Sequence, residues 1–460
     1  MKAEGSTTTE TGYVGILTPE QEDKLRQLWT LLLDVFESDA AGREAVDPQD
    51  PAAGPRETTA PSHHEVDLDQ RPSMKTWLAM LKQENPDALL LRFLRARKWD
   101  VSAAFSMLRA ALDWRRDEMR VDEEVLPKGE PWCKHREMVG EGEGKEGKEG
   151  KETKDAREFL EQFRMGKVYL RGVDRHGRPV GYVHVALHNP AKQSQQTIEK
   201  LVVHFIETAR TLFTPTETGK SEAFCVVFDL SGFSLSNMEW QPARFVIRAF
   251  EANYPECLGT MIIHNAPWVF SGVWKIVRAL LDPVVAAKVD FTRNIADLER
   301  HIPRENIPAK FGGDDPWRFE YHEPGEDEDA CIARADEREK IMVERTAIAE
   351  RLLTATRTWI RQHVDAAEVT EEAEAEAQAQ LLRRDAIEDL RKNYWALDPY
   401  VRSRTHLDRT GVINPGGVID LYPERNAAAV VVVEEPIENE KAVVEAGDIV
   451  PVAQEVEVAA

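Results

Sequence analysis

The sequence predicts an α/β protein in which a mostly parallel sheet is covered by helices. Two apolar runs, AFCVVFDL at 223–230 and GTMIIHNAP at 259–267, are continuous rather than alternating, which is typical of strands buried on both faces. Segments with helical periodicity lie around them, over about 194–213, 238–253 and 271–281. The alternation of such strands with helices is the pattern of the α/β class.

The chain before the sheet is predicted to be helical. Residues 18–37 begin with Thr18 as a capping residue and Pro19 at the first helical position, and their apolar residues recur at helical spacing. A segment rich in Ala, Pro, Asp and Gly follows at 38–70 and predicts a disordered linker. Residues 74–118 then contain two or three helices with apolar faces.

The sheet is expected to begin with a hairpin and to end with a short strand. KVYLRG at 167–172 and PVGYVHVAL at 179–187 flank the turn VDRHGR, and KVDF near residue 290 supplies the last strand. The Gly/Glu/Lys-rich stretch at 140–155 neither follows a strand nor opens an apolar helix, so we interpret it as a flexible insertion rather than a nucleotide loop.

Two long helices of mixed charge, over 330–365 and 379–400, are expected after the sheet. The whole pattern divides the chain into an N-terminal helix with an acidic disordered linker at 1–70, a helical lobe at 71–139, a low-complexity insertion at 140–155, the α/β domain at 156–316, a helical extension at 330–410 and a disordered acidic tail at 411–460.

The charge of the chain is unevenly distributed. The net charge is -23, yet the acidity lies in the two flanks, and residues 71–320 are nearly neutral. A nearly neutral central module argues against nucleic-acid binding, which usually shows as a basic surface. The four cysteines form no C-x-x-C pair, and no stretch resembles a signal peptide or a bilayer-spanning segment. We therefore expect a cytoplasmic protein.

The motifs of several common enzyme classes are missing. DLSGFSLS places serines after a strand without the G-x-S-x-G turn, and neither a G-x-x-x-x-G-K-[ST] phosphate loop nor H-E-x-x-H occurs. The pair His63 and His64, followed by Glu65, lacks further ligands at metal-binding spacing. We expect no catalytic activity, no metal and no cofactor.

One amphipathic element stands out in NAPWVFSGVWKIVRALLDPVVAAKVDF, residues 265–291. A helix starting near Ser271 would place its apolar residues in one stripe, with Lys275 and Arg278 away from it. The apolar residues are Trp268 and Phe270 before the helix, and Val273, Trp274, Val277, Leu280 and Leu281 in the stripe. The stripe fits an ordinary helix on the sheet, and it also fits a lid that closes a cavity in one state and meets a membrane in another.

The stretch LLRFLRARKWD at 90–100 raises the question of where its cations point. At helical spacing Arg92 and Arg95 lie opposite the apolar face, so we expect both in solvent. Arg97 projects from the apolar stripe and is expected to point towards the interior, where a guanidinium requires an anion or several carbonyls. The alternative is that its stem packs while its head reaches solvent or caps the helix end.

Five motifs follow one another between residues 74 and 315. They are LLRFLRARKWDVSAA, VVFDLSGFS, FEANYPECLGTMIIHNAPWVFSGVWKIV, LLDPVVAAKV and IPRENIPAKFGG. Together they resemble the CRAL-TRIO lipid-binding family, and most of all its fungal phosphatidylinositol transfer proteins. The resemblance implies a helical N-terminal lobe beside an α/β lobe with a sheet as its floor, a mobile gating helix at its mouth and one phospholipid inside.

The resemblance also implies residue roles. The arginine of the R-A-R-K motif is Arg97, the glutamate after Tyr-Pro is Glu256 and the lysine after D-P-V is Lys288, so these three are expected to bind an inositol headgroup. Arginine suits bidentate contact with phosphate, and a Glu–Lys pair can bond inositol hydroxyls or brace the gate. The alternatives are a charge at a helix terminus for Glu256 and a gate-hinge residue paired with Glu256 for Lys288.

Three positions depart from the family pattern. Phe224 and Val226 stand where members that also carry phosphatidylcholine have a Ser and a Thr, and Val285 replaces a hydroxyl-bearing residue found near the inositol phosphate in some members. Each lost hydrogen bond is worth roughly 0.5–1.5 kcal/mol. We therefore expect phosphatidylcholine to bind poorly or not at all.

The expected function is that of a carrier that encloses one phosphatidylinositol and moves it between membranes or presents it to a lipid kinase. The expected membrane contact is transient and peripheral, at organelles such as the endoplasmic reticulum, the endosome or the lipid droplet. Two alternatives remain, a carrier of a sterol or isoprenoid and a lipid-independent protein-interaction scaffold that works through its C-terminal helices.

Overall fold

A five-stranded sheet lies at the centre of the computed structural model, which describes residues 11–41, 68–140, 150–213, 222–362 and 371–426. In spatial order its strands are β1 (Val168–Val173), β2 (Pro179–His184), β3 (Phe224–Asp229), β4 (Leu258–His264) and β5 (Val289–Thr292). β1 and β2 are antiparallel, and the later pairs are parallel, which confirms the expected fold class. The elements named here belong to the unit that ends at Leu421, and Tyr422–Ala460 form a second unit.

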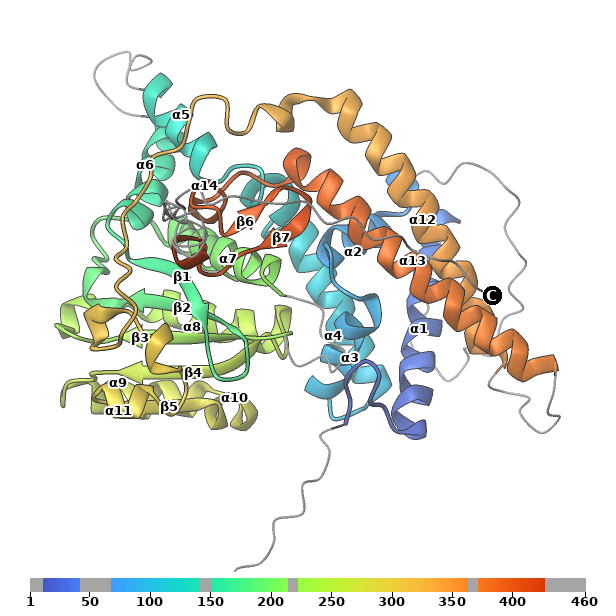
Figure 1. Ribbon diagram of the computed structural model, residues 1–460, viewed down its shortest axis with the longest axis horizontal. Coiled ribbons are helices and arrows are strands. Elements are labelled where there is room, and N and C mark those ends of the chain that lie inside the picture. Colours follow the sequence, from blue (N-terminus) through green and yellow to red (C-terminus); the bar gives the residue numbers. More distant parts are fainter. Residues whose placement is uncertain (1–10, 42–67, 141–149, 214–221, 363–370, 427–460) are drawn as a thin grey trace, which may run out of the picture. The chain divides into compact units, whose positions relative to one another are not determined.

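Helices cover one face of the sheet. They are α7 (Gln195–Thr211), α8 (Trp240–Arg248) and α9 (Phe270–Leu280), close to the expected ranges (Figure 1). Alternate residues of β3, from Phe224 to Phe228, point to this helix-covered face. Gly181 of β2 also lies there, and a Cβ at this position would come within 2.3 Å of the Phe205 ring. Glycine therefore allows α7 to approach the sheet closely.

The opposite face of the sheet is covered by the segment that follows β5. Tyr182, Val227 and Ile262 are fully buried there beneath residues 295–319, which include α11 (Ile295–Leu298). A buried row of polar groups closes this face at the carboxyl ends of the strands, where His184 pairs with Asp229.

Four helices form the N-terminal lobe, in agreement with the predicted helical character of this part. They are α1 (Pro19–Ala40), α2 (Pro72–Leu81), α3 (Pro86–Ala96) and α4 (Val101–Asp113). Thr18 begins α1 with a reciprocal capping box, while Asn85 and Asp100 cap α3 and α4. Because α1 packs against α2, α3 and α4, it belongs to the lobe rather than to a separate N-terminal segment. Of the predicted linker, residues 42–67 lie outside the described part of the chain.

Buried charges join this lobe to α7. We call the group the ionic junction, and its members are Lys82, Glu84, Arg92, Arg115, Glu207 and Arg210. Glu207 contacts the Lys82 ammonium at 2.8 Å and the Arg115 guanidinium at 2.7 Å. Glu84 contacts Arg92 at 2.5 Å and Arg210 at 2.6 Å. Every member has a side chain at most 5% exposed, so each charge depends on its neighbours for compensation.

The predicted insertion at 140–155 is shorter than expected. Its last residues belong to α6 (Lys151–Arg164), in which Thr153 and Ala156 are buried, and residues 141–149 lie outside the described part. The helical turns of α6 continue into KETKD because Thr153 packs against the end of α5 (Glu130–Gly140), close to Gly140.

The C-terminal extension contains two long helices, as expected. α12 (Ala335–Gln362) and α13 (Glu371–Val401) lie side by side along the N-terminal lobe (Figure 1). Arg345 of α12 is 1% exposed and donates to the carbonyl oxygens of Leu78 and Lys82 at 3.2 and 2.9 Å. The extension therefore packs on the core.

The disordered tail predicted at 411–460 was placed too early, because its first residues are folded. After α14 (His406–Arg409), the strands β6 (Ile413–Asn414) and β7 (Val418–Ile419) form a small hairpin, and Val412 and Ile413 are buried in the apolar cluster of the helix-covered face. The prediction missed Val412 and Ile413 because the segment was judged by the Val-, Ala- and Glu-rich composition of its later residues. Residues 427–460 lie outside the described part of the chain.

Short helical turns complete the fold. They include Trp114–Glu118, Val185–Leu187, Leu235–Asn237, Ala249–Asn253 and α10 (Pro283–Ala287). Within the described ranges, none of the helices has the length and apolar character needed to cross a membrane.

Candidate functional site

Glu256 and Lys288 meet at the edge of the sheet where β4 and β5 begin. Glu256 lies two residues before β4 in a left-handed conformation with φ of 58°, and Lys288 ends α10 immediately before β5. The Lys288 ammonium lies 3.0 Å from the Glu256 carboxylate, and each side chain is 22% exposed. The Lys288 carbonyl accepts from the Met261 amide at 2.8 Å, which ties the end of α10 to β4. The pair is therefore held on backbone that belongs to the sheet.

Arg97 does not point towards the interior as predicted. α3 ends at Ala96, and Arg97 is an exposed C-capping residue, followed by Lys98 and Trp99 with positive φ values of 51° and 67°. Helical spacing therefore no longer applies at Arg97, which is the physical reason for the error. Its side chain lies outside the Glu256–Lys288 contact, although α4, four residues further on, packs against the turn Ala249–Asn253 that leads to Glu256.

The two arginines expected in solvent are held by carboxylates instead. Arg92 is 1% exposed and belongs to the ionic junction. Arg95 donates to the Gly12 carbonyl at 2.8 Å and contacts Glu222 at 3.1 Å. The prediction failed because α3 is enclosed on all sides, and its polar face meets charged residues of other elements rather than water.

α9 closes the helix-covered face with the residues expected of the gate. Val273 is buried, Phe270 packs against Phe233 with ring centroids 5.6 Å apart, and Trp274 meets Phe291 of β5 edge-on at 5.1 Å. Val277 packs half-buried on the same cluster. α9 thus contacts the sheet through a narrow apolar stripe.

The two ends of α9 differ in how far their apolar side chains are exposed. Trp268, before the helix, is 88% exposed, and Leu280 at its last position is 42% exposed although the spacing placed it in the stripe. Leu281 is buried, because the backbone leaves the helical conformation there and turns its side chain inward.

The three positions expected to govern lipid selectivity lie in the apolar cluster beneath α9. Phe224 and Val226 of β3 are 0% and 2% exposed, and Val285 of α10 packs half-buried on the cluster. The Phe224 ring lies 5.7 Å from the Phe250 ring and 6.2 Å from Phe205. The floor at β3 is therefore aromatic and aliphatic where hydroxyls would offer hydrogen bonds to a polar headgroup.

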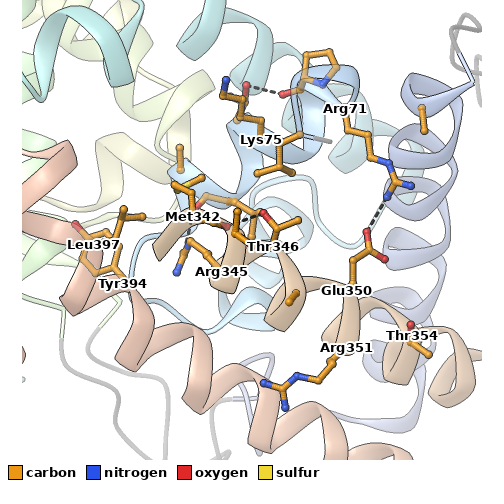
Figure 2. Close-up of a pocket in the computed structure, with 18 of the residues that line it drawn as sticks. Arg71, Lys75, Met342, Arg345, Thr346, Glu350, Arg351, Thr354, Tyr394 and Leu397 are labelled. Carbon is orange, nitrogen blue, oxygen red and sulfur yellow. Dashed lines mark hydrogen bonds and ion pairs between the residues drawn. The ribbon is translucent and has the colours of Figure 1, made fainter. Parts of the chain in front are cut away.

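A large cavity that the sequence did not predict lies away from the gate. It has a volume of about 2280 Å³ and lies among α2, α12 and α13. Figure 2 shows Arg71 reaching Glu350 across it, with a nitrogen–oxygen distance of 2.7 Å. Arg357 pairs with Glu37 at 2.9 Å on the same wall. No local motif could reveal this cavity, since it arises from the packing of α12 and α13 on the lobe.

The polar groups at the carboxyl ends of the strands face the other side of the sheet. His184 Nδ1 lies 2.9 Å from Asp229, and His264 bonds Thr292 Oγ1 at 2.8 Å. Burial raises the pKa of Asp229, but hydrogen bonds from His184 and Ser231 outweigh it and hold the pKa at about 2. Among the hydrogen bonds of the described residues, none joins a serine hydroxyl to a histidine, and the described residues contain no cluster of metal-binding side chains. His63 and His64 lie outside the described residues.

The geometry defines an α/β domain with a helical N-terminal lobe and one amphipathic helix closing an apolar sheet face. Family models described as "CRAL/TRIO domain" and "CRAL/TRIO, N-terminal domain" match residues 163–313 and 24–110. The chain belongs to the CRAL-TRIO family.

Three curated relatives illustrate the similarity. The CRAL-TRIO domain-containing protein C3H8.02 of Schizosaccharomyces pombe is 40% identical over 332 residues, which are 72% of this chain and 67% of that protein. The phosphatidylinositol transfer protein CSR1 of Eremothecium gossypii is 37% identical over 75% of this chain and 73% of its own length. The SEC14 cytosolic factor of the same fungus is 27% identical over 55% of this chain and 77% of its length.

Proposed function

We propose that the protein is a non-enzymatic cytoplasmic carrier that encloses one phosphatidylinositol between α9 and the sheet, and transfers it between membranes or presents it to a lipid kinase. The observation that carries this proposal is the position of the Glu256–Lys288 pair, partly exposed and next to the apolar cluster beneath the gate. The similarity to a protein named a phosphatidylinositol transfer protein, at 37% identity, supports the same ligand.

The energetic need for a closed apolar space follows from the lipid itself. A phospholipid has about 30 chain methylenes, and exposing all of them to water would cost on the order of 20 kcal/mol. A carrier lowers this cost only by surrounding the chains with apolar side chains. The cluster beneath α9 supplies them, with Met261 and Ile263 of β4 beside Phe224 and Val226 of β3.

The headgroup would be selected at the mouth of this space. Lys288 can bind the phosphate and Glu256 the inositol hydroxyls, since charge-assisted hydrogen bonds are about twice as strong as neutral ones. Arg97 is exposed and free to reach a phosphate from α3 without first leaving a buried partner. The absence of hydroxyls at Phe224 and Val226 disfavours phosphatidylcholine, and Val285 removes one hydroxyl contact to the inositol phosphate.

Lipid exchange would occur when α9 opens at a membrane. The stripe of α9 buries only Val273 fully, so moving it breaks few contacts. Its outer surface exposes Ile276 and Leu280, at 50% and 42%, which can enter the interface while the cavity is open. Closing the helix over the chains would release the protein from the membrane.

Native mass spectrometry of the purified protein, with the released lipid identified by fragmentation, tests the proposal. We expect one phosphatidylinositol per chain. A neutral lipid or a sterol in its place would contradict the headgroup assignment, and a lipid-free chain with the apolar cluster filled by side chains would favour the scaffold alternative.

A further inference from the structure

In the described residues, the exposed apolar side chains are not confined to α9. Three of them lie at the tips of different connections, and we call them the edge anchor: Leu187, Leu235 and Trp268, which are 41%, 58% and 88% exposed. They follow β2, β3 and β4, whose last residues His184, Asp229 and His264 are neighbours in the parallel register. The edge anchor therefore lies along one edge of the sheet, next to the start of the gate.

The connections that carry the edge anchor are braced to one another. Asn237 donates its side-chain amide to the carbonyl oxygens of Ala186 and His188, at 3.2 and 2.9 Å, which joins the turn carrying Leu235 to the turn carrying Leu187. Asn265 donates to the Ser231 hydroxyl at 3.1 Å and its backbone amide to the Thr292 carbonyl at 2.9 Å. These bonds hold Leu187 and Leu235 on the sheet independently of α9, whereas Trp268 leads into α9 and its carbonyl accepts from the Ser271 amide at 3.1 Å.

The surface beside the edge anchor is cationic in a chain whose net charge is -23. Residues 240–250 and 257–281, which include α8 and α9, contain no Asp or Glu. Their four cations are exposed, and no ion pair within the described ranges involves them: Arg244, Arg248, Lys275 and Arg278. The nearest acids in sequence are engaged, since Glu239 bonds His188 at 3.0 Å and Glu251 accepts from the Asp282 amide at 2.6 Å.

We propose that the edge anchor and these four cations form a docking surface for an anionic lipid bilayer, and that its members outside α9, namely Leu187, Leu235, Arg244 and Arg248, stay fixed when α9 moves. The combination of apolar tips and unpaired cations is what favours an anionic bilayer as the partner. Apolar tips on uncharged turns can enter the interfacial layer, while the cations next to them meet anionic headgroups. A fixed anchor lets the protein stay at the bilayer while α9 opens, which a surface made of the gate alone would not.

The inference rests on the proposed carrier function, and the experiment measures vesicle binding and bound lipid separately, so that either proposal can fail without the other. The full-length protein is mixed with vesicles of phosphatidylcholine, with or without one quarter phosphatidylserine, and the bound fraction is measured by sedimentation. The double variant Leu187→Ser with Leu235→Ser removes two half-exposed leucines, whose exposed areas together equal about one whole leucine side chain. Because burying one leucine is worth about 1.5 kcal/mol or more, we expect partition to weaken about tenfold on both kinds of vesicle. The control Val418→Ser, at a residue 63% exposed on β7, leaves partition unchanged.

The contribution of the cations to vesicle binding is tested with separate variants. Arg244→Gln with Arg248→Gln weakens binding to the phosphatidylserine vesicles about thirtyfold and leaves binding to phosphatidylcholine unchanged, because each cation near an anionic surface contributes separately. Arg384→Gln with Lys392→Gln on α13, where both side chains are well exposed, serves as the control and has no effect.

Lipid content separates the two proposals. Native mass spectrometry of the leucine variant should still find one phospholipid per chain, since neither leucine lines the apolar cluster. If wild-type protein carries no lipid, the carrier proposal fails regardless of vesicle binding. If lipid is retained and the leucine variant binds vesicles like wild type, the docking surface is refuted. It is likewise refuted if the variant turns a dimer into a monomer in sedimentation velocity, because a second copy of the chain would then cover this surface.

Discussion

Replacing Lys288 by methionine separates a headgroup contact from a structural ion pair. The Lys288–Glu256 pair has an N–O distance of 3.0 Å, but both side chains are partly exposed, and pairs near solvent contribute only about 0–1 kcal/mol to folding. Methionine keeps most of the side-chain volume. We therefore expect the midpoint of urea unfolding to change little. If Lys288 bonds a lipid phosphate, the loss is about 1.5–3 kcal/mol, or roughly 10- to 150-fold in affinity.

The assay is the partition of fluorescent phosphatidylinositol from vesicles into the protein, measured beside a urea titration of the same sample. Lys128→Met is a matched control, since Lys128 pairs with Glu124 at 2.6 Å with comparable exposure but lies far along the chain from β4 and β5. A Lys288→Met protein that binds phosphatidylinositol as wild type does would refute the headgroup role. A loss of several kcal/mol in stability would show instead that the pair braces the fold.

Three further outcomes are expected. Arg97→Ala combined with Lys288→Ala should leave the unfolding midpoint nearly unchanged, because Arg97 is exposed, and should abolish binding of inositol lipid; unchanged binding in the partition assay would contradict the assignment. Glu84→Gln should cost about 3 kcal/mol or more in urea unfolding, since it leaves Arg92 and Arg210 buried without their shared carboxylate; a cost below 1 kcal/mol would show that water reaches them. The low folded pKa of Asp229, about 2, means that its ionised form stabilises the fold above its unfolded pKa near 4 and that this contribution, about 2 kcal/mol, is lost as the pH falls from 4 to 2. The stability difference between wild type and Asp229→Asn should therefore shrink over that interval, and a constant difference would argue against the shift.

The elements of the fold were predictable because their signals are local. Continuous apolar runs defined β3 and β4, the turn VDRHGR located the hairpin, and Thr18 with Pro19 marked the start of α1. The apolar stripe of α9 was also predictable, since it follows from helical spacing alone. Leu280 is the exception, because the stripe does not continue through the end of the helix.

The orientation of the arginines could not be predicted because it depends on tertiary neighbours. A helical wheel assigns Arg92 to solvent, but the side opposite the apolar face of α3 meets Glu84 and α7 rather than water. The wheel also assumes that α3 extends through Arg97, whereas the backbone turns after Ala96. The contact between Glu256 and Lys288 joins residues 32 positions apart, and only the family resemblance suggested that they meet.

The ionic junction has a consequence for how the molecule can move. Glu84 is shared by two cations and Glu207 by three, so removing either carboxylate leaves buried cations without an ion-pair partner in a medium where an unpaired ion is expensive. The N-terminal lobe and α7 should therefore separate all at once or not at all. In hydrogen exchange, amides around Lys82 and Glu207 should open only with global unfolding, whereas those of α9 should open locally and far more often. The ionic junction thus fixes α7 to the N-terminal lobe, so large motion is expected at α9 rather than between the lobe and α7.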